Sequence, residues 1–280
     1  MAGQRQGVLV LGASGKVGRA LRRLWEGGHW RPAAPPLFQT RSPASDPNAL
    51  FWDMLAAPPP ETSCAGILAL AGVTSGDAAA LAANTALARA ASALGARLGV
   101  RVLIASTQAV YGPQPGVLTE DNAPQPQSAY ARAKLEMEQA VAGDAHVCCL
   151  RLGNVAGTDQ LFAAMAAGPV LLDRFASGQG PRRAMIGPRA LAEVATALIA
   201  HKGPLPSVLN VAAVGAVAME DVLNAAKATW AWRPAPATAM EELRIDVSRL
   251  QRLVRVPAAD AKALVAEARQ AGWRAAHDPV

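Results

Sequence analysis

The stretch VLVLGASGKVG (residues 8–18) decides the fold of this chain. Val8 to Leu11 predicts a strand, the glycines after it predict a tight turn, and RALRRLWEGG has the pattern of a helix. Glycines at these positions let the backbone approach a pyrophosphate and let the helix pack closely on the strand. An ordinary glycine turn is the alternative, but the place between a strand and a helix favours dinucleotide binding. We expect dinucleotide contacts from Gly12, Ser14, Gly15, Lys16, Val17 and Gly18.

Strand and helix patterns alternate along the rest of the first half of the chain. Apolar runs predict strands at PLFQTRS, CAGILALAG, VRVLIAS and HVCCLRLGNVAG, and helices are expected at about Asp77 to Leu98 and Ser128 to Ala142. This alternation predicts an α/β fold, a Rossmann-type doubly wound parallel sheet covered by helices on both faces. Ligands of such sheets bind at the carboxyl ends of the strands, where the motifs of this chain lie.

Arg41 ends the second predicted strand, at the position that selects between the two nicotinamide dinucleotides. An acidic residue there would bind the ribose 2'-hydroxyl, whereas an arginine suits a 2'-phosphate, so Arg41 favours NADP over NAD. A solvated loop arginine is the alternative. Asp53 is a candidate to bind the adenine amine of the cofactor. The small residues Ala71 and Gly72 would allow a cofactor to approach the backbone closely.

The segment from Ile104 to Lys134 carries the candidate chemistry. The strand VRVLIAS leads to Thr107, and the following helix carries Tyr130 and Lys134 on one face. A lysine ammonium beside the phenol would favour the phenolate, so we expect Lys134 to lower the pKa of Tyr130 from its usual value of about 10. Thr107 would hold the substrate oxygen. The alternative is a helical pair that serves packing or faces water.

Several motifs together resemble the extended short-chain dehydrogenase/reductase family, often labelled NAD-dependent epimerase/dehydratase. They are GASGKVG, LALAG, Asn84, ASTQAVYG, YARAK and LRLGNVAG, followed by VLNVAAVGAVAMEDVLNAA and IDVSRLQRLVRVP. The resemblance covers nearly the whole chain. It implies that Thr107 is the catalytic hydroxyl, that Tyr130 is the acid/base, and that Lys134 assists it and holds the nicotinamide ribose. Tyr111 would then belong to a structural motif.

The resemblance also implies how the chain is divided. Residues 1–155, with 190–215 returning to them, would form the NAD(P)-binding Rossmann domain, and residues 156–189 and 216–280 a small C-terminal substrate lobe. Substrate contacts are expected from Thr107, Gln108, Asn154 and Arg183. The alanine-rich helices beside the catalytic strand would allow a homodimer, although such faces also suit packing within one chain.

Two departures from the family pattern narrow the chemistry. Sugar-nucleotide 4,6-dehydratases usually have Asp-Glu after the catalytic threonine, whereas this chain has Gln108 and Ala109, which disfavours dehydration. The later motif that resembles R-D-[FYW]-[IV]-H-V-x-D-[LV]-A is RRAMIGPRALA, in which Arg183 matches but the aromatic residue, the histidine and the aspartate are missing. A smaller substrate or a truncated pocket is therefore an open alternative to a nucleotide sugar.

Three functions remain open. The first is an epimerase that keeps NAD tightly bound and returns the hydride to the other face of a sugar or nucleotide-sugar carbon. The second is an NADPH-dependent reductase, which Arg41 favours and which would also suit a smaller carbonyl substrate. The third is a non-catalytic dinucleotide sensor, since a fold does not determine a function; the intact triad argues against it.

Composition limits the remaining possibilities. The 280 residues are 51% hydrophobic, which is enough for a large core. No uninterrupted apolar run reaches the ~18 residues of a membrane span, and the N-terminus lacks the pattern of a signal peptide. We therefore expect a cytoplasmic protein. The three cysteines lack metal-type spacing, which predicts buried thiols and no metal site. The net charge of +6 suits an anionic or sugar-like small molecule, without the clustered basic stripe expected for nucleic acid.

Overall fold

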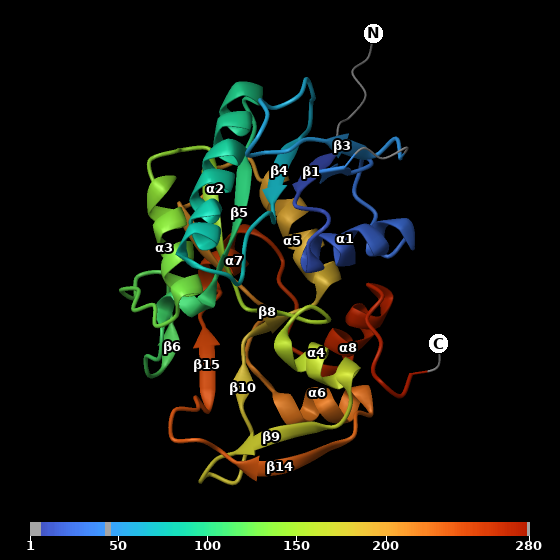
Figure 1. The fold of residues 1–280 in the computed structure, drawn as a ribbon, viewed down its shortest axis with the longest axis vertical. Helices are drawn as coiled ribbons and strands as arrows, with labels where there is room; N and C mark the ends of the chain where they lie inside the picture. The colour runs from blue at the N-terminus through green and yellow to red at the C-terminus, as the bar shows by residue number, and fades with distance from the viewer. Residues whose placement is uncertain (1–6, 43–45, 279–280) are drawn as a thin grey trace.

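The chain forms a seven-stranded parallel sheet, as the sequence predicts. The structure, a computed structural model, describes residues 7–42 and 46–278 (Figure 1). The strand order is β3-β2-β1-β4-β5-β7-β12, and each neighbouring pair is parallel. The strands are β1 (Val8–Leu11), β2 (Leu37–Thr40), β3 (Ala49–Phe51), β4 (Gly66–Ala69), β5 (Val102–Thr107), β7 (Val147–Leu152) and β12 (Val208–Val211).

Helices cover both faces of this sheet (Figure 1). One face carries α1 (Lys16–Glu26) and α5 (Pro188–Ala200), and the other carries α2 (Ala78–Leu98) and α3 (Ala129–Ala140). Both faces are apolar because β1, β4 and β7 are buried along their whole length. The doubly wound α/β prediction is thus confirmed, and the two long helices begin after the cap residues Asp77 and Ser128.

The adjacent cysteines show how the sheet divides the core. Cys148 packs in the cluster on the α1 and α5 side, and Cys149 packs in the cluster on the α2 and α3 side. Both are buried, as is Cys64, and all of these thiols are free. The prediction of buried thiols pointing to opposite faces of a strand is confirmed.

The remaining elements form smaller sheets and helices below the main sheet and at its end (Figure 1). The strands pair as β13-β10-β15-β6, β11-β8 and β14-β9. These elements are η1 (Gln108–Tyr111), β6 (Val117–Leu118), β8 (Asn154–Val155), α4 (Gln160–Ala167), β9 (Val170–Arg174), β10 (Arg182–Arg183), β11 (Met185–Ile186), β13 (Val217–Ala218), α6 (Met219–Ala226), β14 (Trp230–Pro234), β15 (Glu242–Ile245), α7 (Ser248–Leu253) and α8 (Ala261–Gln270).

The C-terminal elements have a core of their own. Phe162 of α4 and Trp273, just after α8, meet edge to face with ring centroids 4.9 Å apart, and the Trp273 indole donates a hydrogen bond to the Phe162 carbonyl at 2.9 Å. Side chains from α4, α6 and α8 complete this cluster. No helix among the described residues is long and apolar enough to cross a membrane.

Candidate active site

The glycine turn between β1 and α1 is closely packed. Gly12 has φ of +80°, and a Cβ atom there would lie 2.4 Å from the backbone nitrogen of Ala71. A Cβ atom on Gly18 would lie 2.4 Å from the Gly12 carbonyl oxygen. Only glycine fits either position without a shift, because real Cβ atoms do not approach backbone atoms this closely. The turn therefore presents bare backbone at the start of α1, as a pyrophosphate site requires.

Gln39 holds this turn, and the sequence analysis did not nominate it. Its side-chain oxygen accepts a hydrogen bond from the Gly12 amide at 2.8 Å, and its amide nitrogen donates to the Trp52 carbonyl at 2.5 Å. The side chain is only 3% exposed. A glutamine inside an otherwise apolar predicted strand was the available signal, since buried polar groups need partners.

A cavity of about 310 Å³ lies beside the turn. The candidates Arg41 and Asp53 both line it, and Asp53 also accepts hydrogen bonds from the Leu55 and Ala56 amides at 3.1 and 3.3 Å. Lys16, Val17 and Gly18 belong instead to the first turn of α1. The lining residues are Gly12, Ser14, Gly15, Gln39, Arg41, Asp53, Met54, Leu55, Leu70, Ala71, Gly72, Val73, Ala83 and Leu87. Bare backbone, a helix N-terminus and a cavity with a cation and a carboxylate fit a dinucleotide.

The structure brings Thr107, Tyr130 and Lys134 together. Thr107 is the last residue of β5, and Tyr130 and Lys134 lie on the facing helix α3. The Thr107 side chain lies close enough to the Tyr130 phenol to influence its pKa. The Lys134 ammonium donates to the Ala105 carbonyl of the same strand at 2.9 Å. Sequence spacing predicted the helical pair, and the structure shows that both of its members meet the catalytic strand.

The pKa values of this group differ in part from the expectation. Burial raises the pKa of Tyr130, and the Thr107 side chain opposes that effect without cancelling it. The prediction that Lys134 lowers this pKa is therefore wrong for this arrangement. Burial lowers the pKa of Lys134 to about 8, against the opposing effects of Cys149 and Glu138. The pKa of Lys134 changes more than that of Tyr130. Lys134 is only 4% exposed, so its charged form has lost its solvation.

Asn84 connects this group to the cavity. Its amide donates to the Val73 carbonyl at 2.9 Å, and its oxygen accepts from the Val73 amide at 3.1 Å. A Cβ atom on Gly72 would lie 2.8 Å from the Asn84 oxygen and 3.1 Å from the Lys134 ammonium. Asn84 therefore braces neighbouring backbone. It holds the loop after β4 close to Lys134.

A buried ion pair lies beside β5. The Arg151 guanidinium on β7 donates to both carboxylate oxygens of Glu138 on α3, at 2.8 to 3.2 Å, and the Ser106 hydroxyl also donates to Glu138. The pair connects β5, β7 and α3, the elements that carry Thr107, Tyr130 and Lys134. No local pattern predicted this pair, although a charged residue inside the apolar strand HVCCLRLGNVAG and another one helical turn after Lys134 were the available signal.

The other three candidate substrate residues, besides Thr107, lie around the same strand ends. Gln108 donates a hydrogen bond to Asn154 at 3.0 Å, and the Asn154 backbone amide donates to the Ala184 carbonyl at 2.9 Å. Arg183, the residue before Ala184, donates to the carbonyls of Met240 and Glu241 at 2.6 and 3.0 Å. Burial lowers the pKa of Arg183. Two of the candidates are thus in contact, and the third is bound to the segment before β15.

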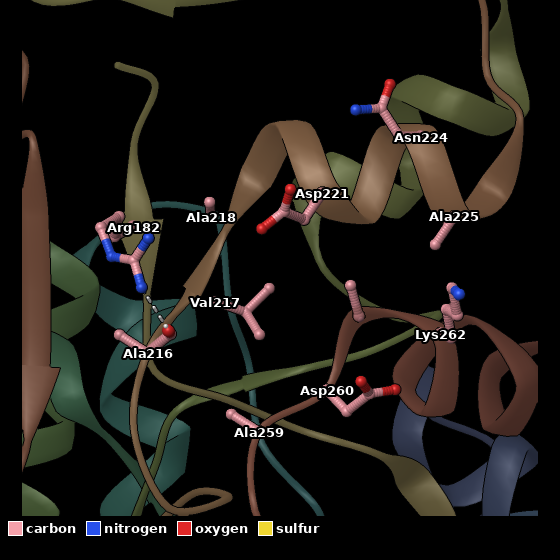
Figure 2. A pocket seen from close by; sticks show the side chains of 11 residues that line it. Arg182, Ala216, Val217, Ala218, Asp221, Asn224, Ala225, Ala259, Asp260 and Lys262 are labelled. Carbon is pink, nitrogen blue, oxygen red and sulfur yellow. Dashed lines mark hydrogen bonds between the residues drawn. The ribbon is translucent and has the colours of Figure 1, made fainter.

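A second cavity, of about 540 Å³, lies in the C-terminal part between α6 and the start of α8. Figure 2 shows the Asp221 carboxylate directed toward Arg182, which donates to the Ala216 carbonyl at 3.0 Å, whereas the Asp260 carboxylate accepts from the Ala263 amide and caps α8. Lys262 adds a second cation to the lining. Two carboxylates and two cations give this cavity no net preference for a ligand of either charge. Thr107, Tyr130 and Lys134 do not line it.

The fold, the glycine turn and the Thr107–Tyr130–Lys134 group define an extended short-chain dehydrogenase/reductase. The family model described as the RmlD substrate binding domain matches residues 6–165, more than half of the 280 residues, and the chain belongs to this family. A search of curated proteins finds no significant match.

Solved structures share the fold at low sequence identity. The UDP-glucose 4-epimerase from Brucella ovis, in complex with NAD, is 17% identical with a TM-score of 0.75, and the match covers 96% of this chain and 99% of that one. MoeE5 in complex with UDP-glucuronic acid and NAD is 20% identical with a TM-score of 0.69, covering 94% and 98% of the two chains. TunA, an NAD-dependent NDP-hexosamine 5,6-dehydratase involved in tunicamycin biosynthesis, is 21% identical with a TM-score of 0.68, covering 98% and 100%.

Proposed function

We propose that the protein is an NAD(P)-dependent oxidoreductase or epimerase that moves hydride at a hydroxyl or keto carbon of a sugar or nucleotide-sugar substrate. The observation that carries this proposal is the meeting of Thr107, at the end of β5, with Tyr130 and Lys134, which lie one helical turn apart on α3. The nearness of Lys134 to Gly72, which lines the 310 Å³ cavity, supports a catalytic group beside the proposed dinucleotide site.

The similar structures support the same class of activity. The Brucella epimerase and MoeE5 are described with NAD, and MoeE5 is described with a UDP-sugar. We extend NAD(P) and nucleotide-sugar binding to this chain because the shared fold covers nearly all of each neighbour, and because this chain has a glycine turn with a cavity beside it.

The proposed roles follow from the chemistry of each side chain. A bound nicotinamide supplies the hydride acceptor or donor. Tyr130 exchanges a proton with the substrate oxygen, Thr107 holds that oxygen through its hydroxyl, and the Lys134 ammonium holds the nicotinamide ribose. Gln108 and Ala109 carry no carboxylate, so we do not assign a 4,6-dehydratase reaction to this site.

In the same proposal, different parts of the chain bind the cofactor and the substrate. Residues 1–155 with 190–215 hold the cofactor, through the glycine turn, Arg41, Asp53, Ala71 and Gly72. Residues 156–189 and 216–280 close over the substrate, which meets Gln108, Asn154 and Arg183. A homodimer through α2 and α3, which lie side by side on one face of the sheet, is part of the proposal (Figure 1).

A second candidate, an NADPH-dependent reductase of a smaller carbonyl substrate, is favoured by Arg41. This arginine lines the cofactor cavity, where it suits a 2'-phosphate. An epimerase uses tightly held NAD and causes no net redox change, whereas a reductase consumes added NADPH, so the cofactor separates the two.

The test begins with the cofactor and continues with turnover. Thermal unfolding of the purified protein is measured with NAD and with NADP, because a ligand of the native state raises the melting temperature. Conversion of UDP-glucose to UDP-galactose is followed by NMR, and NADPH oxidation is followed with keto-sugars. Stabilisation by one dinucleotide together with turnover in either assay supports the proposal. Dinucleotide binding without turnover in any assay favours a sensor, and no binding of either dinucleotide overturns the proposal.

A further inference from the structure

Two consecutive residues of β5 are bonded to two side chains of α3. The Lys134 ammonium donates to the Ala105 carbonyl at 2.9 Å, and the Ser106 hydroxyl donates to the Glu138 carboxylate. Glu138 follows Lys134 by one helical turn, and Thr107 follows Ser106 directly. The strand is therefore bonded to the helix at the two residues before the proposed catalytic hydroxyl.

The spacing on α3 places these contacts in a single row. Tyr130, Lys134 and Glu138 are four residues apart, so they lie along one face of the helix. Opposite this row, the end of β5 places Thr107 close to Tyr130 and Ser106 at Glu138. A displacement of the strand along the helix would have to break the bond between Ser106 and Glu138. The position of Thr107 relative to Tyr130 thus depends on the Glu138 carboxylate.

Arg151 of β7 holds this carboxylate in place. Its Nε and Nη2 atoms donate to Glu138 at 3.1 and 2.8 Å, and both side chains are 5% exposed. Arg151 Nη1 is buried without a hydrogen-bond partner among the residues that the structure describes. An apolar pair of similar volume is often as stable as a buried ion pair, and an unsatisfied donor adds a cost. Stability alone therefore does not explain why an arginine and a glutamate occupy this part of the core.

The charge of Glu138 also acts on Lys134. Burial lowers the pKa of Lys134 to about 8, and Cys149 and Glu138 oppose this effect. Burial raises the pKa of Cys149 to about 12 and the pKa of Tyr130 above its usual value, so both groups are neutral near pH 8. Glu138 is thus the anion that favours the ammonium form of Lys134 in this arrangement.

Other charges on the elements around Lys134 are either paired with Glu138 or exposed. β5 has no charged side chain, and β7 adds Arg151, which is directed at Glu138. The remaining charged side chains of α2 and α3 are exposed, so solvent screens them. Within the described ranges 7–42 and 46–278, no second buried carboxylate contributes to the pKa of Lys134.

We propose that Glu138 is a positioning residue of the site, which fixes Thr107 through Ser106 and keeps Lys134 in its charged form. The proposal rests on the proposed function, because it takes Thr107, Tyr130 and Lys134 as the catalytic group. Glu138 lines neither the 310 Å³ cavity nor the 540 Å³ cavity, so it acts on the substrate and the dinucleotide only through these side chains.

The first experiment removes the link between Glu138 and β5. Ser106→Ala leaves both charges of the ion pair in place, and it should lower kcat about tenfold with KM within about twofold, because the reacting groups are displaced while the binding contacts are kept. The matched control is Ser92→Ala, which removes a buried hydroxyl that donates to the Asp144 carboxylate before the start of β7. Its kcat and KM should both stay within about twofold of the wild-type values.

The second experiment removes the ion pair without leaving a charge unpaired. The double variant Glu138→Leu with Arg151→Met replaces both members by apolar side chains, a change that buried pairs often tolerate without loss of stability. We expect kcat to fall about tenfold, as in Ser106→Ala. The pH at which kcat is lost on the basic side should also move down by about half a unit or more, because Lys134 loses the anion that favours its ammonium form. Ser106→Ala should keep the wild-type pH profile.

An NMR titration of Lys134 measures the same effect without turnover. The side-chain resonances, assigned with Lys134→Met, should titrate at a lower pH in the double variant than in the wild type, and at the wild-type pH in Ser106→Ala. The titration uses the free protein, so it does not depend on a substrate.

The proposal is overturned by a kcat of Ser106→Ala within about twofold of wild type, by an equal loss in Ser92→Ala, or by an unmoved Lys134 titration in the folded double variant. Because Ser106→Ala retains the ion pair, the comparison of the two serine variants decides the outcome for a double variant that does not fold. A wild type without turnover in any assay counts against the proposed function, and the Lys134 titration then decides the role of Glu138 by itself.

Discussion

Arg151 and Glu138 form an ion pair in which the guanidinium nitrogen Nη2 lies 2.8 Å from the carboxylate oxygen Oε2, and each side chain is only 5% exposed. The pair joins β7 to α3, while the Ser106 hydroxyl joins the same carboxylate to β5. The Arg151 guanidinium also lies 4.8 Å from the ring centroid of Tyr111. The elements that carry the proposed catalytic group are therefore tied together through one buried carboxylate.

Removal of that carboxylate should strongly destabilise the protein. Glu138→Ala leaves the Arg151 charge buried without its partner, and we expect the free energy of unfolding to fall by about 3–5 kcal/mol in urea denaturation. Glu136→Ala, an exposed position on the same helix, is the control and should change it by less than about 0.5 kcal/mol. Equal stabilities of the two variants would show that the pair does not hold these elements together.

The depressed pKa of Lys134 makes a prediction about pH. With a pKa of about 8 in the folded protein against 10.5 unfolded, the folded state binds fewer protons between these values, so its stability rises as the pH rises through this window. Lys134→Met lacks this dependence. The stability of the variant minus that of the wild type should therefore fall by about 3 kcal/mol between pH 7 and pH 10.5. A difference that stays constant over this range would contradict the burial of a charged lysine.

Much of the fold was predictable because its signals are local. Apolar runs followed by glycines or polar residues predicted the parallel strands, and Asp77 and Ser128 were close to the observed helix starts. Tyr130 and Lys134 were predictable from helical spacing, and Thr107 from its place at the end of a strand. The buried thiols followed from the apolar surroundings of the cysteines.

The contacts between distant segments were not predictable in this way. Gln39 hydrogen-bonds Gly12 of the glycine turn, 27 residues earlier in the sequence. Glu138 of α3 pairs with Arg151 of β7, which is a different element of the fold. The direction of the Tyr130 pKa depends on the balance of burial and one neighbouring side chain, which residue types alone do not determine. The length of β2 also differs: it ends at Thr40, so Arg41 lies just after the strand and lines the cavity.

Gly18→Ala tests the close packing of the glycine turn. The added Cβ would lie 2.4 Å from the Gly12 carbonyl oxygen and would force α1 away from the turn. We expect the free energy of unfolding to fall by about 1–3 kcal/mol, and dinucleotide binding to weaken at least tenfold by calorimetry. Gly143→Ala is the control, since nothing lies within 4 Å of its added Cβ, and it should leave both quantities nearly unchanged. Wild-type dinucleotide affinity in Gly18→Ala would remove the turn from the proposed site.

The two tyrosines of the chain provide a matched test of the proposed acid/base. Tyr130→Phe should lower kcat/KM by about 10²–10⁴ and leave dinucleotide affinity unchanged, because it removes the proton-transfer group alone. Tyr111→Phe removes a buried hydroxyl that donates to Asn210 at 2.7 Å, so it should cost about 1 kcal/mol of stability and leave kcat/KM within a few-fold. The reverse result, with the larger loss of turnover in Tyr111→Phe, would reassign the acid/base.

Arg41→Ser tests how the cavity distinguishes the two dinucleotides. Arg41 lines the cavity with Gly12 and Asp53, and a guanidinium there would form charge-assisted hydrogen bonds with a 2'-phosphate. Loss of such bonds, worth about 1.5–3 kcal/mol, should weaken NADP binding roughly tenfold to a hundredfold in a calorimetric titration, whereas NAD affinity should stay within twofold. Arg255→Ser removes the same charge at an exposed position that does not line the cavity, and it controls for the loss of net positive charge. An equal loss of affinity for NAD and NADP in Arg41→Ser would mean that Arg41 shapes the cavity for both dinucleotides and does not recognise the phosphate.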